Sequence, residues 1–168
     1  MPAAHSGAKR RPGEMGPQAQ ALWDSLEFRT PAVLRAIEPL SDDQLQWGPP
    51  NGANSIAWLL WHIAEVEDNW VRDRILGLPK RFPFGASVKA RADGAWPNKT
   101  DLVAYFREVR AISRRRLEET AEDEFDRRVI DDRFGEITVR RLWSGVATSG
   151  AWHGGQIVLI ANRLVPRP

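Results

Sequence analysis

Histidine is the side chain of this 168-residue sequence best suited to bind a transition metal, because the chain has three histidines and no cysteine. His5 lies in the N-terminal stretch, among small residues, prolines and cations. His62 is followed by Glu65 and Asn69 at positions i+3 and i+7, so a helix would place these three side chains on one polar stripe. His153 lies in a second helical pattern, far along the chain. A site shared by His62 and His153 therefore requires two distant helices to pack side by side.

His153 is predicted to lie on the apolar face of its helix. At helical spacing this face also carries Leu142, Val146, Ser149, Ile157, Ile160 and Leu164. A buried imidazole nitrogen without a hydrogen-bond partner costs about 1–3 kcal/mol, so it needs a side chain, a backbone carbonyl or a metal ion. Two interpretations stay open from the residues alone. The histidines are either structural, with Glu65, Ser149 or Gln156 as partners, or they form part of a metal site in the core of a helical bundle.

The helical segment around His153 is also rich in glycine, although each helical glycine costs about 1 kcal/mol relative to alanine. The glycines are Gly145, Gly150, Gly154 and Gly155. Small residues either allow a neighbouring backbone to come close or leave space for a ligand. We favour close packing of helices over a pocket.

A row of arginines lies on the preceding helical segment, where Arg107, Arg110 and Arg114 share one face. Such a row can guide an anionic substrate. Because Glu108 and Glu118 are interleaved with these cations, we favour a solvated charged face.

The charge balance argues against nucleic acid as a partner. The chain carries 24 basic and 22 acidic residues, of which Lys9, Arg10, Arg11 and Glu14 belong to the N-terminal stretch. Without these four, 24 − 3 = 21 basic and 22 − 1 = 21 acidic residues remain. A nucleic-acid-binding domain normally keeps a basic excess, which this domain lacks.

Composition also bears on location and assembly. No stretch reaches 18 consecutive apolar residues, so no membrane span or membrane partner is expected. The lack of cysteine and of an apolar signal segment fits a cytoplasmic protein. Eight tryptophans are difficult to bury in so small a chain, and we therefore expect a homodimer.

Helical periodicity divides the chain into a disordered tail, residues 1–16, and a single domain, residues 17–168. Within the domain, four long helical segments are predicted, over residues of about 17–37, 54–76, 98–120 and 138–164. Pro31 either kinks the first segment or starts a second helix capped by Thr30. A long aperiodic loop follows the second segment, and a small hairpin is expected just before the fourth. These elements predict an all-α four-helix bundle.

Two motifs resemble those of a known family. Residues 54–67, NSIAWLLWHIAEVE, resemble the second helix of the DinB-like (DinB/YfiT-like) superfamily, and residues 151–160, AWHGGQIVLI, resemble its fourth-helix signature. The resemblance implies a DinB/YfiT-like four-helix bundle with a long loop after the second helix and a short extended segment before the fourth. It also implies a protein that is often dimeric and that holds a divalent metal ion such as zinc or nickel.

The same resemblance implies which residues hold the metal. His62 and His153 match two ligand positions of the family, and the third-ligand position is occupied by Ser149. A serine hydroxyl stays protonated and is a poor ligand, so Glu65, one turn from His62, or an extra water molecule would have to complete the coordination. We expect Trp58, Glu65, Asn69, Ser149 and Gln156 to form the pocket.

Two functions follow as expectations from this resemblance. Characterised relatives include transferases and isomerases that use mycothiol or bacillithiol, which implies a metal-dependent thiol S-transferase with a low-molecular-weight thiol or another small molecule as its partner. The alternative is a metal-free member that has lost the site and acts as a small-molecule-binding or interaction protein. Ser149 favours the alternative, and the two retained histidines favour the enzyme.

Overall fold

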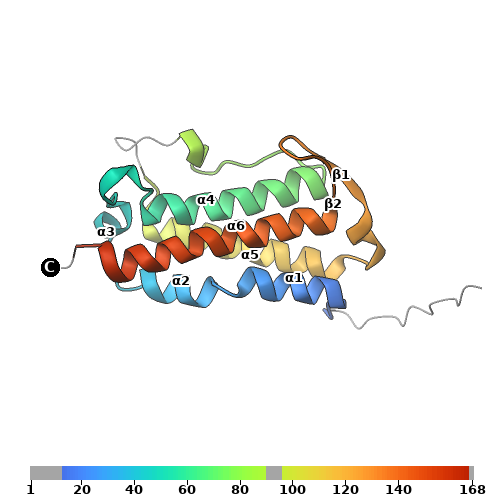
Figure 1. The fold of residues 1–168 in the computed structure, drawn as a ribbon, viewed down its shortest axis with the longest axis horizontal. Helices are drawn as coiled ribbons and strands as arrows, with labels where there is room; N and C mark the ends of the chain where they lie inside the picture. Colours follow the sequence, from blue (N-terminus) through green and yellow to red (C-terminus); the bar gives the residue numbers. More distant parts are fainter. Residues whose placement is uncertain (1–12, 90–95, 167–168) are drawn as a thin grey trace, which may run out of the picture.

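The first long segment forms two helices, α1 (Pro17–Glu27) and α2 (Thr30–Ile37), in the computed structural model, which describes residues 13–89 and 96–166 (Figure 1). The backbone of Phe28 and Arg29 stays right-handed, so the break is a kink. Pro31 explains it, because proline has no N–H to donate to the carbonyl four residues earlier. The Thr30 hydroxyl does not cap α2 but donates to Glu27 Oε1.

Side-chain caps fix where the following helices begin. Ser41 and Gln44 form the reciprocal capping box of α3 (Asp42–Gln46), and the Ser55 hydroxyl accepts from the amide of Trp58 at the start of α4. The turn η1 (Pro50–Gly52) lies between them, and α4 (Ile56–Asn69) continues into the wider π-helical turn η2 (Trp70–Ile75). This helix ends at Gly77, whose φ of +64° suits glycine.

The loop after η2 runs back along α4 (Figure 1). Polar side chains of α4 hold it in place. Asn69 Oδ1 accepts from the amide of Arg81 at 2.6 Å, and Asp68 Oδ2 lies 2.8 Å from Arg81 Nε. Further along, Glu65 binds the short turn η3 (Ser87–Lys89).

The second half of the chain completes the bundle. Its elements are α5 (Lys99–Glu119), η4 (Asp123–Asp126), β1 (Arg128–Asp131), β2 (Gly135–Thr138), α6 (Val139–Leu159) and η5 (Ile160–Leu164). The two strands form the expected antiparallel hairpin, with Val129 opposite Ile137. Asn98 and Thr138 cap α5 and α6 with their side-chain oxygens, which confirms two predicted helix starts.

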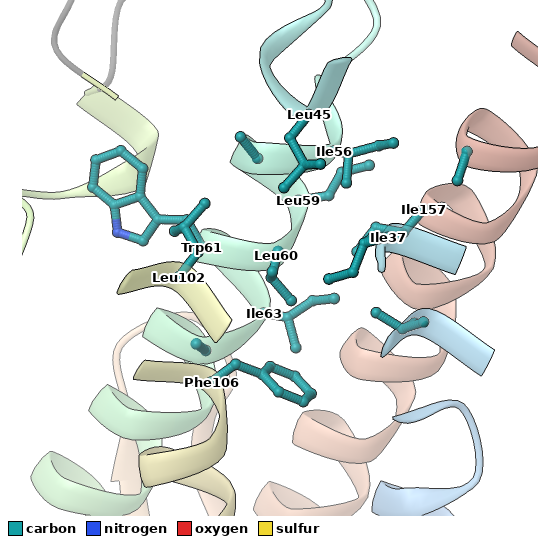
Figure 2. Packing of buried hydrophobic residues seen from close by; sticks show 14 of the residues in the cluster. Ile37, Leu45, Ile56, Leu59, Leu60, Trp61, Ile63, Leu102, Phe106 and Ile157 are labelled. Atoms are coloured by element: carbon teal, nitrogen blue, oxygen red, sulfur yellow. The ribbon is translucent and has the colours of Figure 1, made fainter. Parts of the chain in front are cut away.

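The core consists of two hydrophobic clusters separated by buried polar side chains. One cluster centres on residues such as Leu60, Phe106 and Ile157, which converge from α4, α5 and α6 (Figure 2). The other centres on Trp143 and Phe125, nearer the hairpin. The polar layer, which we define as Glu67, Arg110 and Ser113, lies on α4 and α5 between the residues of the two clusters.

The boundary of the domain lies slightly before Pro17. Met15 packs against the hairpin-side cluster, and Gly16 is buried and accepts the backbone bond of Gln20. These two residues of the expected tail therefore belong to the bundle, while residues 1–12 lie outside the described residues. None of the helices in residues 13–89 and 96–166 is long and apolar enough to cross a membrane.

Candidate metal site and ligand cleft

The two histidines lie together between α4 and α6. The ring centroids of His62 and His153 are 5.3 Å apart, with the ring planes at 83°. Both side chains are half-buried. The rings are therefore well within the separation of about 10 Å beyond which two imidazoles could not share an ion at bonds of about 2.1 Å.

The proton of His62 is positioned by a chain of hydrogen bonds that ends at Glu65. The Ser87 hydroxyl and the Ser87 amide donate to the two carboxylate oxygens of Glu65, at 3.0 and 2.8 Å. Since the hydroxyl proton is used in this way, Ser87 Oγ accepts from His62 Nδ1, 3.0 Å away. The hydrogen-bond partners thus place the imidazole proton on Nδ1 and leave a lone pair on His62 Nε2.

His153 is held in the same manner by a residue of its own helix. Its Nδ1 donates to Gln156 Oε1 at 2.9 Å, which leaves a lone pair on His153 Nε2. Metal-binding histidines characteristically donate the other ring N–H to an oxygen, and both imidazoles have that arrangement here.

Trp58 fixes the orientation of the His62 ring. The indole stacks on the imidazole at 4.5 Å with an angle of 15°, and its Nε1 donates to the carbonyl oxygen of Ser87 at 2.8 Å. The edge contact of Trp58 with His153 is longer, at 6.4 Å. The indole thus links the His62 ring to the loop.

Burial keeps His62 neutral. Desolvation, and secondarily the nearby charge of His153 when protonated, lower the pKa of His62 from 6.5 to about 4. Glu65 is more deeply buried, and this desolvation raises its pKa against the opposing effect of the Ser87 hydrogen bonds. A neutral imidazole is the form that binds metal ions.

The lowered pKa of His62 makes the metal-free protein sensitive to acid. Between pH 6.5 and 4 the unfolded chain binds a proton at His62 that the folded chain does not, so the free energy of unfolding falls as the pH falls. We expect a loss of about 2–3 kcal/mol from this group. Urea unfolding at pH 7 and at pH 4, with EDTA, should show a smaller pH effect in His62→Gln than in the wild type. An equal effect in both would contradict the assignment.

A cleft of about 640 Å³ opens beside the histidines. Its walls are His62, Val66, Trp70, Arg133, Phe134, Ile137, Arg141, Leu142, Ser144, Gly145, Thr148, Ser149, Trp152 and His153. Of the five residues predicted to form a pocket, only Ser149 lines this cleft. The other four have different contacts. Trp58 stacks on His62, Glu65 binds Ser87, and Gln156 binds His153. Asn69 binds the backbone of the loop at Arg81.

The glycines of α6 differ in how closely other side chains pack against them. A Cβ on Gly145 would come within 2.9 Å of the Trp70 ring, and one on Gly154 within 3.2 Å of Val33. These two serve close packing, as favoured from the sequence. No atom lies within 4 Å of a Cβ at Gly150 or Gly155, so these positions face open space.

Comparison with known proteins gives a decisive match. Residues 25–157 match the DinB superfamily. The chain belongs to the DinB superfamily. This confirms the resemblance carried by residues 54–67 and 151–160, and the described fold confirms the all-α bundle.

The DinB-superfamily fold also has a solved counterpart. A crystal structure described as the conserved protein of locus from Enterococcus faecalis is similar over 88% of this chain and 96% of that chain, with a TM-score of 0.66 and 17% identity. At this identity the likeness shows the fold alone. No curated protein matches the sequence significantly.

Within the described residues of this DinB-superfamily chain, no third metal donor accompanies the two histidines. In the part of the chain that the structure describes, no group of three His, Cys, Asp or Glu side chains could hold an ion. Ser149 lines the cleft with His153, one helical turn away, and both oxygens of Glu65 are bonded to Ser87. The donors that converge are therefore two imidazole nitrogens.

Sequence reasoning missed three kinds of residue around this DinB-superfamily site. Ser87 lies in an aperiodic loop that gives no signal of its contacts. Arg133 lies in the turn of the hairpin, where charged residues are common. Arg141 could have been found only indirectly, because helical spacing aligns it with Gly145, Thr148 and Trp152, on the stripe beside that of Ser149 and His153.

Proposed function

We propose that this protein binds a divalent metal ion, zinc or nickel, through Nε2 of His62 and Nε2 of His153, and that it acts on a small molecule in the adjoining cleft. The observation that carries the proposal is the matched fixation of both Nδ1 protons, by Ser87 and by Gln156. This leaves one lone pair on each imidazole, with the rings 5.3 Å apart. Two such nitrogens fit the donor preferences of zinc and nickel, and the remaining positions would go to water or ligand.

The proposed chemistry is thiol S-transfer with a low-molecular-weight thiol of the mycothiol or bacillithiol type. A bound zinc or nickel ion lowers the pKa of a thiol that coordinates it. The protein's own residues position the two imidazoles. Ser87 and Glu65 keep the proton on Nδ1 of His62, Gln156 does so for His153, and Trp58 restricts the rotation of the His62 ring.

A second function is favoured by one specific observation. Ser149 lines the cleft one turn before His153 but is a poor metal ligand, and catalytic zinc sites normally have three protein ligands. A metal-free protein would keep the cleft of about 640 Å³ and use it for small-molecule binding or for an interaction.

Calorimetric titration of zinc and nickel into untagged, EDTA-treated protein separates the two functions. We expect binding by the wild type and a loss of affinity of more than about 100-fold in His62→Ala and His153→Ala, because loss of a supporting partner alone costs 10–100-fold. His5→Ala is the matched control and should bind like the wild type. Wild type that binds no metal, or binds it equally after both substitutions, would support the metal-free function.

The homodimer and the cytoplasmic location stay predictions. Trp61 and Trp143 are buried within one chain, whereas Trp152 remains 69% exposed at the rim of the cleft. The argument for a dimer therefore depends on Trp152 rather than on all eight tryptophans. Sedimentation of the wild type and of Trp152→Ser would test this, with a dimer expected only for the wild type.

A further inference from the structure

The cleft beside the histidines is long, and its two ends differ in chemistry. Along α6 it extends from Arg141 to His153, twelve residues or about 18 Å at the helical rise. Val66 of α4 and Trp70 of η2 line the same cleft, and the Trp70 ring packs against Gly145 of α6. The hairpin residues Arg133 and Phe134 close the end away from the histidines.

Two arginines meet at the hairpin end. The guanidinium carbon of Arg133 lies 5.2 Å from the centroid of the Phe134 ring, and that of Arg141 lies 5.8 Å from the same centroid. Neither side chain forms an ion pair with another described residue. The two guanidinium groups are therefore gathered around one aromatic ring, and among the described residues no carboxylate lies within ion-pair distance of them. The nearby Asp131 carboxylate accepts from the backbone amides of Arg133 and Phe134 and pairs with Arg74.

The neighbouring arginines are different. Arg74 pairs with Asp131, Arg128 with Glu136, and Arg140 with Asp126. The arginines without an acidic partner in this region are the two that line the cleft. A guanidinium group binds carboxylate and phosphate through paired hydrogen bonds, so a cleft with two of them suits an anionic ligand.

The middle of the cleft is mainly apolar. Val66, Trp70 and Ile137 line it beside the hydroxyl groups of Ser144 and Thr148. The Trp70 ring lies so close to Gly145 that a Cβ there would come within 2.9 Å of it. An apolar or aromatic segment of a ligand would pack against these side chains.

We infer that Arg133 and Arg141 form an anion-binding subsite, and that the ligand of the cleft is an elongated molecule with a carboxylate or phosphate at one end and an apolar segment behind it. This inference deepens the proposed function and rests on its claim that the cleft holds the ligand. The charged end binds at the hairpin, and the reacting end lies at His62 and His153. The predicted Arg107–Arg110–Arg114 row is not part of this cleft.

Matched small probes test the subsite without any metal. The probes are 4-phenylbutyrate, its neutral analogue 4-phenylbutyramide, and phenyl phosphate, titrated into the full chain with EDTA and followed by NMR. We expect phenylbutyrate to bind at least about tenfold more tightly than the amide, the ratio that corresponds to 1.4 kcal/mol. Phenyl phosphate shows which anion is preferred, and it too must exceed the amide if phosphate is the natural group.

Variants assign the preference to the two arginines. In the double variant Arg133→Gln/Arg141→Gln the preference for the anion over the amide should disappear. Arg140→Gln is the matched control. It removes the same charge from the residue next to Arg141, but Arg140 pairs with Asp126 and does not line the cleft. It should keep the preference. Both single variants are also measured, so that the result does not depend on the folding of the double variant.

Three results would overturn the inference: an amide that binds as tightly as the carboxylate, an anion that fails to bind at millimolar concentration, or an equal loss in Arg140→Gln. The proposed metal site is assessed separately, because zinc titration of the double variant should match that of the wild type. If the probes do not bind at the arginines, the zinc affinity is still measured independently. If zinc does not bind, the preference for the anionic probe is still measured, because those titrations contain EDTA.

Discussion

Replacement of Ser149 with histidine should tighten zinc binding by at least about tenfold, which corresponds to a gain of about 1.4 kcal/mol. Position 149 lies one turn before His153 and lines the same cleft, so an imidazole there would add a third nitrogen to those of His62 and His153. Three nitrogens and an open position are the usual arrangement of catalytic zinc. The cleft of about 640 Å³ has room for the larger side chain.

The control for this gain is Ser144→His. It adds a histidine to the same cleft, but nine residues from His153, or about 14 Å along α6. Calorimetric titration of zinc should show tighter binding for Ser149→His only. Equal affinity of wild type and Ser149→His, with the variant folded, would mean that position 149 does not face the site.

Replacement of Arg110 with methionine should lower the free energy of unfolding by about 3–5 kcal/mol, the usual cost of removing one partner of a buried ion pair. Arg110 Nη2 lies 3.0 Å from Glu67 Oε2, and Nη1 donates to the carbonyl oxygen of Leu26 at 2.5 Å. Burial raises the pKa of Glu67, and the charge of Arg110 opposes this rise. Without Arg110 the Glu67 carboxyl group would be buried without a cation, beside the carboxylates of Glu27 and Asp68.

Urea unfolding measures this effect, with Arg107→Met as the control. Arg107 was grouped with Arg110 on one helix face, but it is exposed, and its replacement should change stability by less than about 0.5 kcal/mol. The double variant Glu67→Gln/Arg110→Met should recover part of the loss. Equal effects of the Arg107 and Arg110 variants would contradict the buried pair.

Much of the fold could be predicted because local chemistry determines it. Ser41, Asn98 and Thr138 carry side-chain oxygens that bond the first free amides of a helix, and these contacts span only three residues. The strand pairing of Val129 with Ile137 likewise depends on a short turn. The choice between kink and cap at Pro31 could not be made, since it depends on the direction in which α2 packs.

The site was predictable only where helical spacing decides it. His62 and His153 could be placed on facing helices from periodicity and from the family motifs. Arg110 was interpreted as solvated because Glu108 and Glu118 are interleaved with the arginines, whereas its partner Glu67 comes from another helix. Asn69 was placed in the pocket because it continues the stripe of His62 and Glu65, whereas its side chain binds the backbone at Arg81. Contacts between distant segments leave no periodic signal in the sequence.

The position of Ser87 makes the loop and the site thermodynamically linked. Ser87 belongs to the loop, yet its amide, hydroxyl and carbonyl bond Glu65, His62 and Trp58. If a ligand on His62 is held more tightly when Ser87 is docked, then docking of Ser87 must be favoured by the same free energy when that ligand is bound. Binding of a ligand at His62 and docking of Ser87 on α4 then stabilise each other by the same free energy. Arg81 bonds Asp68, Asn69 and Glu108 rather than the imidazoles, so a substitution there would change metal binding through the loop.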